Sequence, residues 1–255
     1  MGKFRIIAIA LVALIGISSS AYAEADLIQP DDFVGFTFWL VSIACLAATV
    51  FFFLEHGSVA PAWKTSIAVA GIVSGIAFVH SIYMANIWVR TGDAPTVYRY
   101  IDWLITMPLL AIEFYLILST VRKASSIIFW KLLIGALVMV LGGYAGETGY
   151  ISSLLGFIIW MAGWLYILYE IFAGEAGKLC FKSSNKAMVK AFETMRMILA
   201  IGWATYPFGY VFGYLTGGID SNTLNVIYNF ADFINKIAFG LVIWVAARNQ
   251  HNESR

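Results

Sequence analysis

Long apolar stretches separated by short polar connections dominate the pattern of this sequence. Seven of them follow residue 32, and each is near the ~20 residues that a helix needs to cross the hydrocarbon core of a membrane. They run over Phe33–Leu54, Thr65–Val89, Val97–Val121, Ser126–Tyr144, Ile151–Ala173, Ala191–Thr216 and Thr223–Ala247. The longest polar connection is expected over Gly174–Lys190. The pattern therefore predicts an all-α membrane protein, a single bundle of seven transmembrane helices.

The first 23 residues follow a different pattern. Two basic residues precede a short apolar run, Ile6–Ile17, and the segment ends in Ala21-Tyr22-Ala23, the A-x-A form of a signal peptidase site. Residues 1–23 are therefore predicted to be a cleaved secretory signal peptide, which leaves residues 24–255 as the transmembrane domain. A short first membrane helix is the alternative, but the run is shorter than a spanning helix requires.

The basic residues predict how the bundle is oriented. If the mature amino terminus lies outside, an odd number of spans places the carboxyl terminus in the cytoplasm. The connections that would then be inside, together with the segment after the last span, hold Lys64, Arg122, Lys123, Lys131, Lys178, Lys182, Lys186, Lys190 and Arg248, whereas the outer connections hold Arg90. This asymmetry fits the positive-inside rule. We therefore expect a multi-pass protein of a cytoplasmic membrane.

Composition excludes several classes of protein. Hydrophobic residues make up 61% of the chain and charged residues 12%, whereas soluble domains have about 25% charged residues. Sixteen basic residues against fifteen acidic ones give a net charge of +1, so a nucleic-acid partner is not expected, because such a protein must neutralise many phosphates. Cys45 and Cys180 stand alone, and no metal site is predicted from them. The expected partner is the lipid bilayer.

Ionisable residues within the predicted spans carry the functional signal. Six of them stand out: His80, Arg99, Asp102, Glu113, Asp232 and Lys236. A charge at mid-helix costs about 2.5–3.5 kcal/mol on insertion scales, so such groups are rare unless they face the bundle interior. Lys236 lies about 12 residues from Arg248, roughly 18 Å along a helix, which is too far for its stem to reach the interface. Asp232 lies one turn earlier, a spacing that a structural ion pair would explain equally well.

The third span places further acids on one helical face. Asp102 and Thr106 are four residues apart, and Glu113 is eleven beyond Asp102, which is three turns plus about 20°. The two carboxyls are then roughly 16 Å apart along the axis, with Arg99 a further turn outward. A single acid would be interpreted as a packing residue. Two acids with a mid-membrane amine nearby indicate a proton relay.

Aromatic and large apolar side chains recur at helical spacing beside these groups. They are Trp203, Tyr206, Pro207 and Tyr210 on the sixth span, Trp103, Met107 and Leu110 on the third, and Trp160 and Trp164 on the fifth. Taken singly, each stripe is more often ordinary helix packing. Their convergence on a buried lysine indicates a pocket for a long, flat, apolar ligand with an aldehyde end, which a lysine can hold as a Schiff base.

These residues resemble a known family. Arg99-Tyr100-Ile101-Asp102-Trp103-Leu104-Ile105-Thr106, with Pro108, and Asp232-Phe233-Ile234-Asn235-Lys236 are similar to the third- and seventh-helix signatures of the microbial rhodopsins. The acids at positions 102 and 113 with Thr106, the motif Glu113-Phe114-Tyr115 and His80 resemble the bacterial proteorhodopsins in particular. The resemblance covers nearly the whole mature chain and implies the seven-helix bundle of the microbial (type 1) rhodopsin kind.

The resemblance also implies a function. It implies a photoreceptor and light-driven outward proton pump of the bacterial inner membrane, a transporter rather than an enzyme, with all-trans retinal bound covalently to Lys236. Asp102 is implied as primary counterion and proton acceptor, Glu113 as cytoplasmic proton donor and Asp232 as second counterion. Arg99 would order charge on the exit side, and His80 would hydrogen-bond Asp102 and raise its proton affinity.

Three further expectations follow from the resemblance. Leu110 stands where the family uses leucine for green and glutamine for blue absorption, which implies green light. Ser81 follows His80 where the family often has a tyrosine, so Tyr206 is the expected hydrogen-bond donor to Asp232. Relatives form pentameric or hexameric rings, so a homo-oligomer without an obligatory transducer is expected.

Two features leave alternatives open. Glu147, in the outer connection after the fourth span, is interpreted as a solvated loop carboxylate, with a role in proton release as the alternative. Pro207 is interpreted as a packed kink, with a hinge as the alternative.

Other functional classes remain to be compared with a pump. A photosensory receptor that signals through a transducer would share the pocket, but usually lacks a carboxylic donor. Sodium or chloride pumps would replace Asp102 or Thr106, and neither is replaced. A seven-helix transporter without retinal is the remaining alternative.

Overall fold

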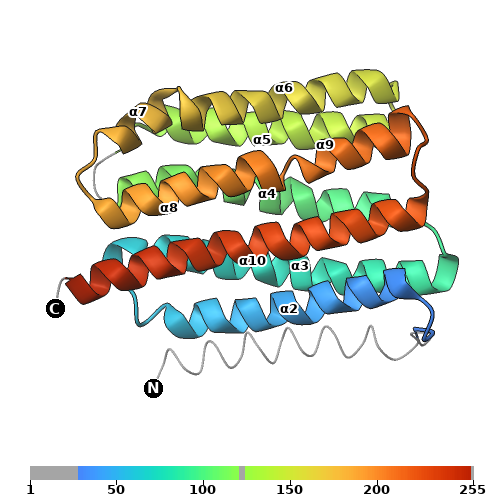
Figure 1. Cartoon of the computed structure of the whole chain (residues 1–255), viewed down its shortest axis with the longest axis horizontal. Coiled ribbons are helices and arrows are strands. Elements are labelled where there is room, and N and C mark those ends of the chain that lie inside the picture. The colour runs from blue at the N-terminus through green and yellow to red at the C-terminus, as the bar shows by residue number, and fades with distance from the viewer. Residues whose placement is uncertain (1–27, 121–123, 254–255) are drawn as a thin grey trace.

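Seven helices long and apolar enough to cross a membrane make up most of the described chain. The computed structural model describes residues 28–120 and 124–253, in which the regular elements are helices (Figure 1). The prediction of a seven-helix membrane bundle is confirmed. The predicted signal peptide, residues 1–23, lies outside the described residues.

The observed spans begin and end close to the predicted limits. The elements are α2 (Phe33–Glu55), η1 (Pro61–Trp63), α3 (Lys64–Thr91), α4 (Thr96–Ser119), α5 (Ser126–Glu147), α6 (Ser153–Phe172), α7 (Glu175–Phe181), α8 (Lys186–Met197), η2 (Ile198–Gly202), α9 (Thr205–Tyr210), η3 (Val211–Leu215) and α10 (Ser221–Glu253). The fifth span continues from α6 into α7, and the sixth runs from α8 to η3.

The connection expected over Gly174–Lys190 is shorter than the sequence indicated. The helix α7 takes up 7 of its residues, and α8 already begins at Lys186. The side chain of Asn185 accepts a hydrogen bond of 2.8 Å from the Met188 backbone N–H and so caps the start of α8. Hydropathy missed this helical turn because its lysines are exposed to solvent.

The two ends of the bundle differ in chemistry. At one end, which we call the glycine end, Gly92, Gly149 and Gly217 adopt positive φ angles of 69°, 78° and 65°. Glycine adopts this left-handed backbone conformation at little cost, and these three glycines end or link the helices there. At the opposite end, called the lysine end, the exposed Lys178 and Lys182 lie around α7. The glycine end is the predicted outer side and the lysine end the predicted cytoplasmic side.

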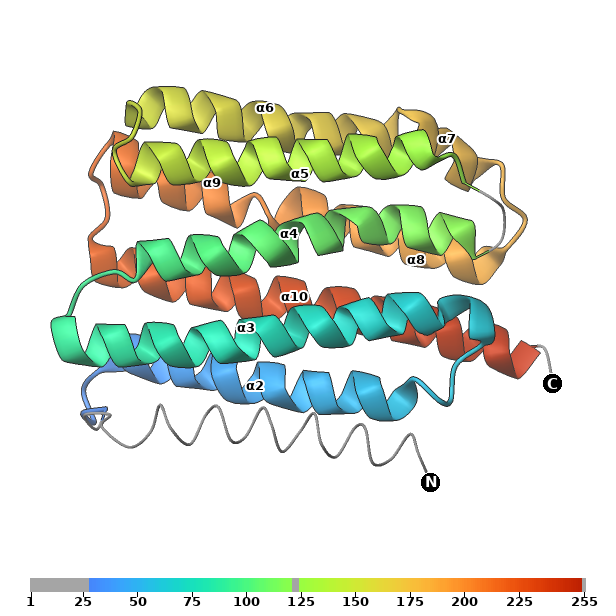
Figure 2. The ribbon, with the colours of Figure 1, turned by 180° about the vertical axis from the view of Figure 1, so that it is seen from behind.

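The helices α5 and α6 lie side by side along one edge of the bundle, and α2 and α3 along the opposite edge (Figures 1 and 2). Small residues allow the close approach of α5 and α6, as is common between membrane helices. A Cβ atom on Gly163 of α6 would lie 2.6 Å from the Met139 backbone nitrogen and 2.7 Å from the Gly135 carbonyl oxygen of α5. This packing leaves α4, α8, α9 and α10 to build the interior between the two pairs.

The sixth span is broken in its middle. Pro207 has no backbone N–H, so the normal bond from its position to the Trp203 carbonyl is absent. The Tyr206 N–H instead donates to the Trp203 oxygen at 3.1 Å. The π-helical segments η2 and η3 lie on either side of α9, and the ribbon is displaced between α8 and α9 (Figure 1). Proline and the π-helical turns account for the predicted kink; a hinge motion there stays a prediction.

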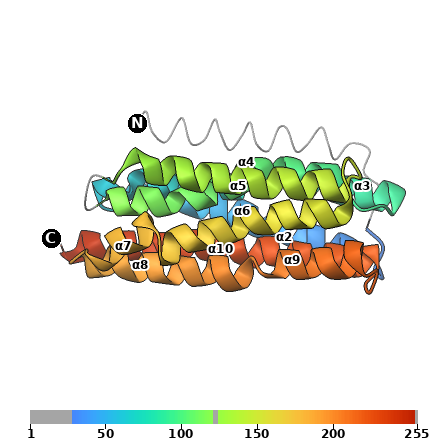
Figure 3. The same cartoon turned by 90° about the horizontal axis from the view of Figure 1, so that it is seen from above.

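Viewed from above, α4 and α5 lie on one side of the molecule and α8, α9 and α10 on the other (Figure 3). The interior between these two sides is where α4 and α10 face each other. This arrangement brings Asp102 of the third span against Lys236 of the seventh.

Candidate functional site

Lys236 of α10 is buried between two carboxylates. Only 2% of the residue is exposed. Its Nζ forms a salt bridge with Oδ2 of Asp102 on α4, and it lies 3.3 Å from Oδ2 of Asp232, one turn earlier on α10. A buried charge is tolerated only when it is paired. The structure therefore places the predicted lysine and both predicted counterions in one cluster.

Asp232 is held by neutral hydrogen-bond donors. The Tyr206 hydroxyl donates to Oδ1 at 2.7 Å, and the indole N–H of Trp103 donates to Oδ1 at 3.1 Å and to Oδ2 at 3.3 Å. The expected bond from Tyr206 is confirmed, and the bond from Trp103 was not anticipated. These hydrogen bonds fix the position of the Asp232 carboxylate beside Lys236.

Asp102 has fewer partners than Asp232. Its Oδ1 is buried without a hydrogen-bond partner in the described part of the chain. The Thr106 hydroxyl donates to the backbone oxygen of Asp102 at 2.9 Å, not to the carboxylate. Beyond Lys236, therefore, little holds this carboxylate in its charged form.

The expected hydrogen bond between His80 and Asp102 is not formed. The two side chains are neighbours, but Nδ1 of His80 lies 3.9 Å from Oδ1 of Asp102, which is too long for a hydrogen bond. Nδ1 instead lies 3.2 Å from the carbonyl oxygen of Ile76, one turn earlier on α3. A backbone carbonyl on the same helix competes for the ring nitrogen, and sequence spacing does not reveal that competition.

Glu113 lies three turns along α4 toward the lysine end. The residue is 1% exposed, and both carboxyl oxygens lack a hydrogen-bond partner among the described residues. The side chain of Ser66, on α3, lies near the carboxyl. The Glu113 carboxyl is therefore enclosed by the protein and shielded from solvent.

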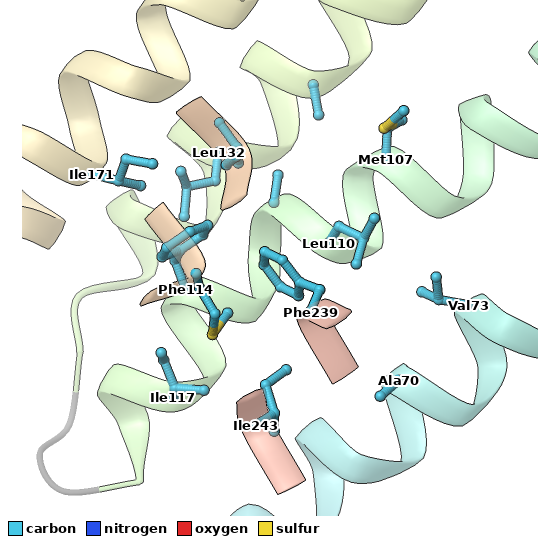
Figure 4. Packing of buried hydrophobic residues seen from close by; sticks show 14 of the residues in the cluster. Ala70, Val73, Met107, Leu110, Phe114, Ile117, Leu132, Ile171, Phe239 and Ile243 are labelled. Atoms are coloured by element: carbon cyan, nitrogen blue, oxygen red, sulfur yellow. The ribbon is translucent and has the colours of Figure 1, made fainter. Parts of the chain in front are cut away.

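An apolar layer surrounds this part of α4. Figure 4 shows Leu110, Phe114 and Ile117 of α4 packing toward Phe239 and Ile243 of α10, with Ala70 and Val73 of α3 beside them. The Phe114 ring lies 5.8 Å from the Phe239 ring, centroid to centroid, and 5.0 Å from that of Phe192 on α8. The layer separates the Lys236 cluster from solvent at the lysine end.

The predicted pocket residues converge in the interior. One buried cluster contains Trp103, Met107, Leu110, Trp160, Trp164, Trp203 and Tyr206, and Pro207 is buried as well. The Trp160 and Trp164 rings lie 6.0 Å apart. Tyr210 is buried but directed elsewhere, since its hydroxyl donates to the Ser153 carbonyl at the start of α6, at 2.9 Å. Contact of these residues with a cofactor stays a prediction.

The chemistry of this interior fits a retinal molecule. A primary amine stands beside two carboxylates that can balance a positive nitrogen, and aromatic rings flank it. The indole nitrogen of Trp203 and the side-chain amide of Asn235, the residue before Lys236, are buried without hydrogen-bond partners in the described chain. Orphaned polar groups at such a position are typical of a site that is completed by a ligand or by water.

Arg99 lies one turn from Asp102 toward the glycine end, and amides hold it there. Its Nη2 donates to Oδ1 of Asn225 at 2.9 Å and to Oδ1 of Asn229 at 3.1 Å. Neither asparagine was predicted from the sequence. The signal was present, because residues 225, 229, 232 and 236 are spaced by four, three and four and share one face of α10.

Glu147 is not the solvated loop carboxylate that the sequence indicated. It is the last residue of α5 and is partly buried. The Tyr228 hydroxyl of α10 lies 3.5 Å from its Oε1, and Tyr100 and Tyr214 also face the carboxyl. The polar, glycine-rich sequence around it suggested a loop, but side chains from distant parts of the chain enclose it.

Comparisons with known proteins agree with this geometry. Residues 32–250 match the model of the family described as bacteriorhodopsin-like protein. The chain is 50% identical over 255 residues to the blue-light absorbing proteorhodopsin of Gamma-proteobacterium Hot 75m4, covering 99% of this chain and 100% of that one. It is 49% identical over 244 residues to the green-light absorbing proteorhodopsin of Gamma-proteobacterium EBAC31A08, covering 95% and 97%. The crystal structure of blue light-absorbing proteorhodopsin from Med12 superposes with a TM-score of 0.76 at 49% identity, covering 86% of this chain and all of that one.

Proposed function

The chain belongs to the bacteriorhodopsin-like protein family, and from this premise we propose that it is a light-driven pump that moves protons outward across a bacterial inner membrane. The observation that carries the proposal is the arrangement of three groups. The Lys236 nitrogen is buried beside Asp102 of α4. A second acid, Glu113, lies on α4 as well, three turns closer to the lysine end. A donor, a switchable nitrogen and an acceptor in this order are what directional proton transfer requires.

The cofactor of the proposal is all-trans retinal. Retinal would be bound through its aldehyde carbon to Nζ of Lys236 as a Schiff base. It would supply visible absorption, and light would change the direction in which the N–H bond of that nitrogen points. Trp103, Trp203 and Tyr206 would form the walls around it, with Met107 and Leu110 beside them. The family membership and the residues of the site support this assignment.

The outward transfer uses the difference between the two aspartates. Asp102 accepts a proton on its carboxylate from the Lys236 nitrogen, because few donors stabilise its ionised form. Asp232 stays ionised, since Tyr206 and Trp103 donate to it. It then preserves one negative charge beside the nitrogen throughout the cycle.

The refilling step uses Glu113. Its buried carboxyl gives a proton to the Lys236 nitrogen from the side of the lysine end and then regains one from the cytoplasm. The apolar layer formed by Leu110, Phe114 and Phe239 excludes water from this path until the transfer. One proton thus enters at the lysine end for each proton that leaves at the glycine end.

The colour and the assembly belong to the same proposal. Leu110 is buried on the face of α4 that carries the pocket, and its identity favours green absorption, although the similar proteins include both blue- and green-absorbing types. A homo-oligomeric ring, an external amino terminus and independence from a transducer complete the proposal.

The experiment that tests the proposal is a light-induced pH change. Cells that express this chain alone are supplied with all-trans retinal and illuminated while the pH of the medium is recorded. A pump acidifies the medium, and a protonophore abolishes the signal. A coloured protein that leaves the pH unchanged would instead be a photosensory receptor, and no colour at all would indicate a transporter without retinal.

A further inference from the structure

A cavity lies at the lysine end, where α7 is beside the start of α5 and the end of α6 (Figures 1 and 2). Its volume is about 590 Å³. Side chains that can donate hydrogen bonds line it from these helices and their ends: Ser125, Lys131, Tyr169, Lys178 and Lys182. We call it the lysine cavity. Its lining residues have no task in the proposed pump.

The two acids of the lysine cavity are already paired. Glu170 is 1% exposed, and its Oε1 accepts a hydrogen bond of 3.0 Å from the Ala176 backbone N–H. Its Oε2 lies 3.2 Å from Nζ of Lys131, and the same nitrogen lies 3.4 Å from Oε2 of Glu175. A buried carboxylate requires such partners. Lys131 therefore fixes α5 to α6 and α7 and offsets part of the acid charge in the lining.

Two cations of the lining remain available to a ligand. Lys178 and Lys182 are exposed and lie four residues apart, one turn at the end of α7. Neither amine takes part in a salt bridge within the described part of the chain. Three lysines against two glutamates give the lining a net charge of +1. An anion in the cavity can therefore be held by two amines through charge-assisted hydrogen bonds.

Exposed aromatic side chains indicate that the cavity lies at the level of the lipid headgroups. Trp130 of α5, Tyr169 of α6 and Phe181 of α7 are 57%, 59% and 60% exposed. Trp130 and Phe181 directly precede the lining residues Lys131 and Lys182. Tryptophan and tyrosine gather where the hydrocarbon meets the headgroups, and lysine side chains extend from that level toward the phosphates. A ligand in the cavity would therefore border on acyl chains as well as on water.

We propose that the lysine cavity binds the headgroup of an anionic phospholipid from the leaflet at the lysine end. Lys178 and Lys182 hold the phosphate oxygens, and Ser125 and Tyr169 offer hydroxyls to the rest of the headgroup. The net positive lining repels the choline of a zwitterionic lipid, which favours an anionic one. The exposed aromatic rings, which a soluble anion would leave uncovered, favour a lipid. This inference requires the membrane bundle and does not depend on the pump.

The test measures lipid binding by native mass spectrometry of the purified protein. The protein in detergent is titrated with phosphatidylglycerol, which is anionic, and in parallel with phosphatidylcholine, which is zwitterionic. The parent should bind one phosphatidylglycerol per chain in preference to phosphatidylcholine. The double variant Lys178→Gln with Lys182→Gln should bind phosphatidylglycerol about thirtyfold more weakly, since each lysine near an anionic lipid contributes about fivefold.

Two further variants separate a site from general attraction. Lys186→Gln with Lys190→Gln removes two exposed amines of α8 at the same spacing, and neither amine lines the cavity. This matched control should bind phosphatidylglycerol like the parent. Glu175→Gln removes an acid from the lining and one partner of Lys131, so it should bind about fivefold more tightly. A variant that fails to fold cannot produce such a gain.

A last comparison separates a lipid from a soluble anion. The Tm of the parent, followed by circular dichroism, should rise with phosphatidylglycerol and stay unchanged with inorganic phosphate. An equal rise with inorganic phosphate would contradict the lipid assignment. Equal weakening in the two double variants, or equal binding of the two lipids by the parent, would contradict the site. Because these measurements use no light, their result does not depend on whether the chain pumps protons.

Discussion

Asp102 and Asp232 approach the same buried amine from two helices, but neutral donors hold only Asp232. Two side chains donate to the Asp232 carboxylate, whereas one oxygen of Asp102 has no hydrogen-bond partner in the described chain. This difference assigns separate tasks to two chemically identical groups. In the proposed pump, Asp102 would exchange the proton and Asp232 would keep the charge.

Replacing Asp102 by asparagine tests the acceptor. In the parent, acidification protonates Asp102 and removes a negative charge beside the positive Lys236 nitrogen, so the visible band should shift to the red. Asp102→Asn should be red-shifted at every pH, with light-driven proton release reduced by about a hundredfold or more. The measurement is a spectrophotometric pH titration. A variant that retains the acid transition of the parent would identify a different group as the acceptor.

Replacing Glu113 by glutamine tests the donor. Gln keeps the shape of the side chain but holds no transferable acid proton, so return of the proton to the Lys236 nitrogen should slow by about a hundredfold or more. The first transfer, to Asp102, should keep its rate. Flash photolysis measures both steps. The donor assignment is contradicted if the return step keeps the rate of the parent. The matched control is Glu193→Gln, because the Glu193 side chain on α8 is 46% exposed, and it should leave both steps unchanged.

Leu110 tests the expected colour. The parent should absorb green light, and Leu110→Gln should shift the band to the blue, because an amide dipole in the pocket changes the field along the chromophore. Leu104→Gln is the matched control, since Leu104 lies on the same helix but is 40% exposed. The measurement is the position of the visible absorption band in the three purified proteins. A blue-absorbing parent, or a control that shifts as far as Leu110→Gln, would remove Leu110 as the determinant.

The hydrogen bond that Asp220 accepts is expected to make a pH-dependent contribution to the stability of the fold. Its Oδ1 accepts a 2.7 Å hydrogen bond from the Thr223 backbone N–H at the start of α10, the helix that carries Lys236. This bond lowers the pKa of the Asp220 carboxyl below its ordinary value. Because the folded-state pKa is depressed, the stabilisation is full above the unfolded-state pKa and is lost as the pH falls through the folded-state pKa.

Two variants separate the cap from its charge. Asp220→Ala should lower the Tm at neutral pH, since the helix loses its capping acceptor. Asp220→Asn keeps an acceptor oxygen but has no carboxyl group to protonate. Its Tm should therefore fall less on acidification than the Tm of the parent. Thermal loss of the visible band measures both effects. Equal acid dependence in the parent and in Asp220→Asn would show that this carboxylate does not contribute.

The sequence correctly predicted the features that depend on residues close together along the chain. The spans follow from apolar length, and the burial of Lys236 follows from its distance to both helix ends. The bond from Tyr206 to Asp232 followed from family resemblance and is present. Residues whose surroundings come from several helices were predicted less well. Glu147 was assigned to solvent because its tyrosines lie 47, 67 and 81 positions away in the sequence.

Local competition explains the other differences. His80 does not bond Asp102 because the Ile76 carbonyl lies nearer to its ring nitrogen. The partners of Arg99 were missed because asparagines are uncharged and do not stand out in an apolar span. The start of α8 was missed because a helix continues into solvent where its hydropathy ends.

The central claim is that the buried Lys236 nitrogen carries the chromophore that absorbs light. The most direct measurement is the visible spectrum of the purified protein before and after addition of all-trans retinal, for the parent and for Lys236→Ala. The account predicts a strong visible band in the parent that borohydride reduction fixes to Lys236, and no such band in Lys236→Ala. A parent that stays colourless with retinal, or a Lys236→Ala variant with the same band, would contradict it.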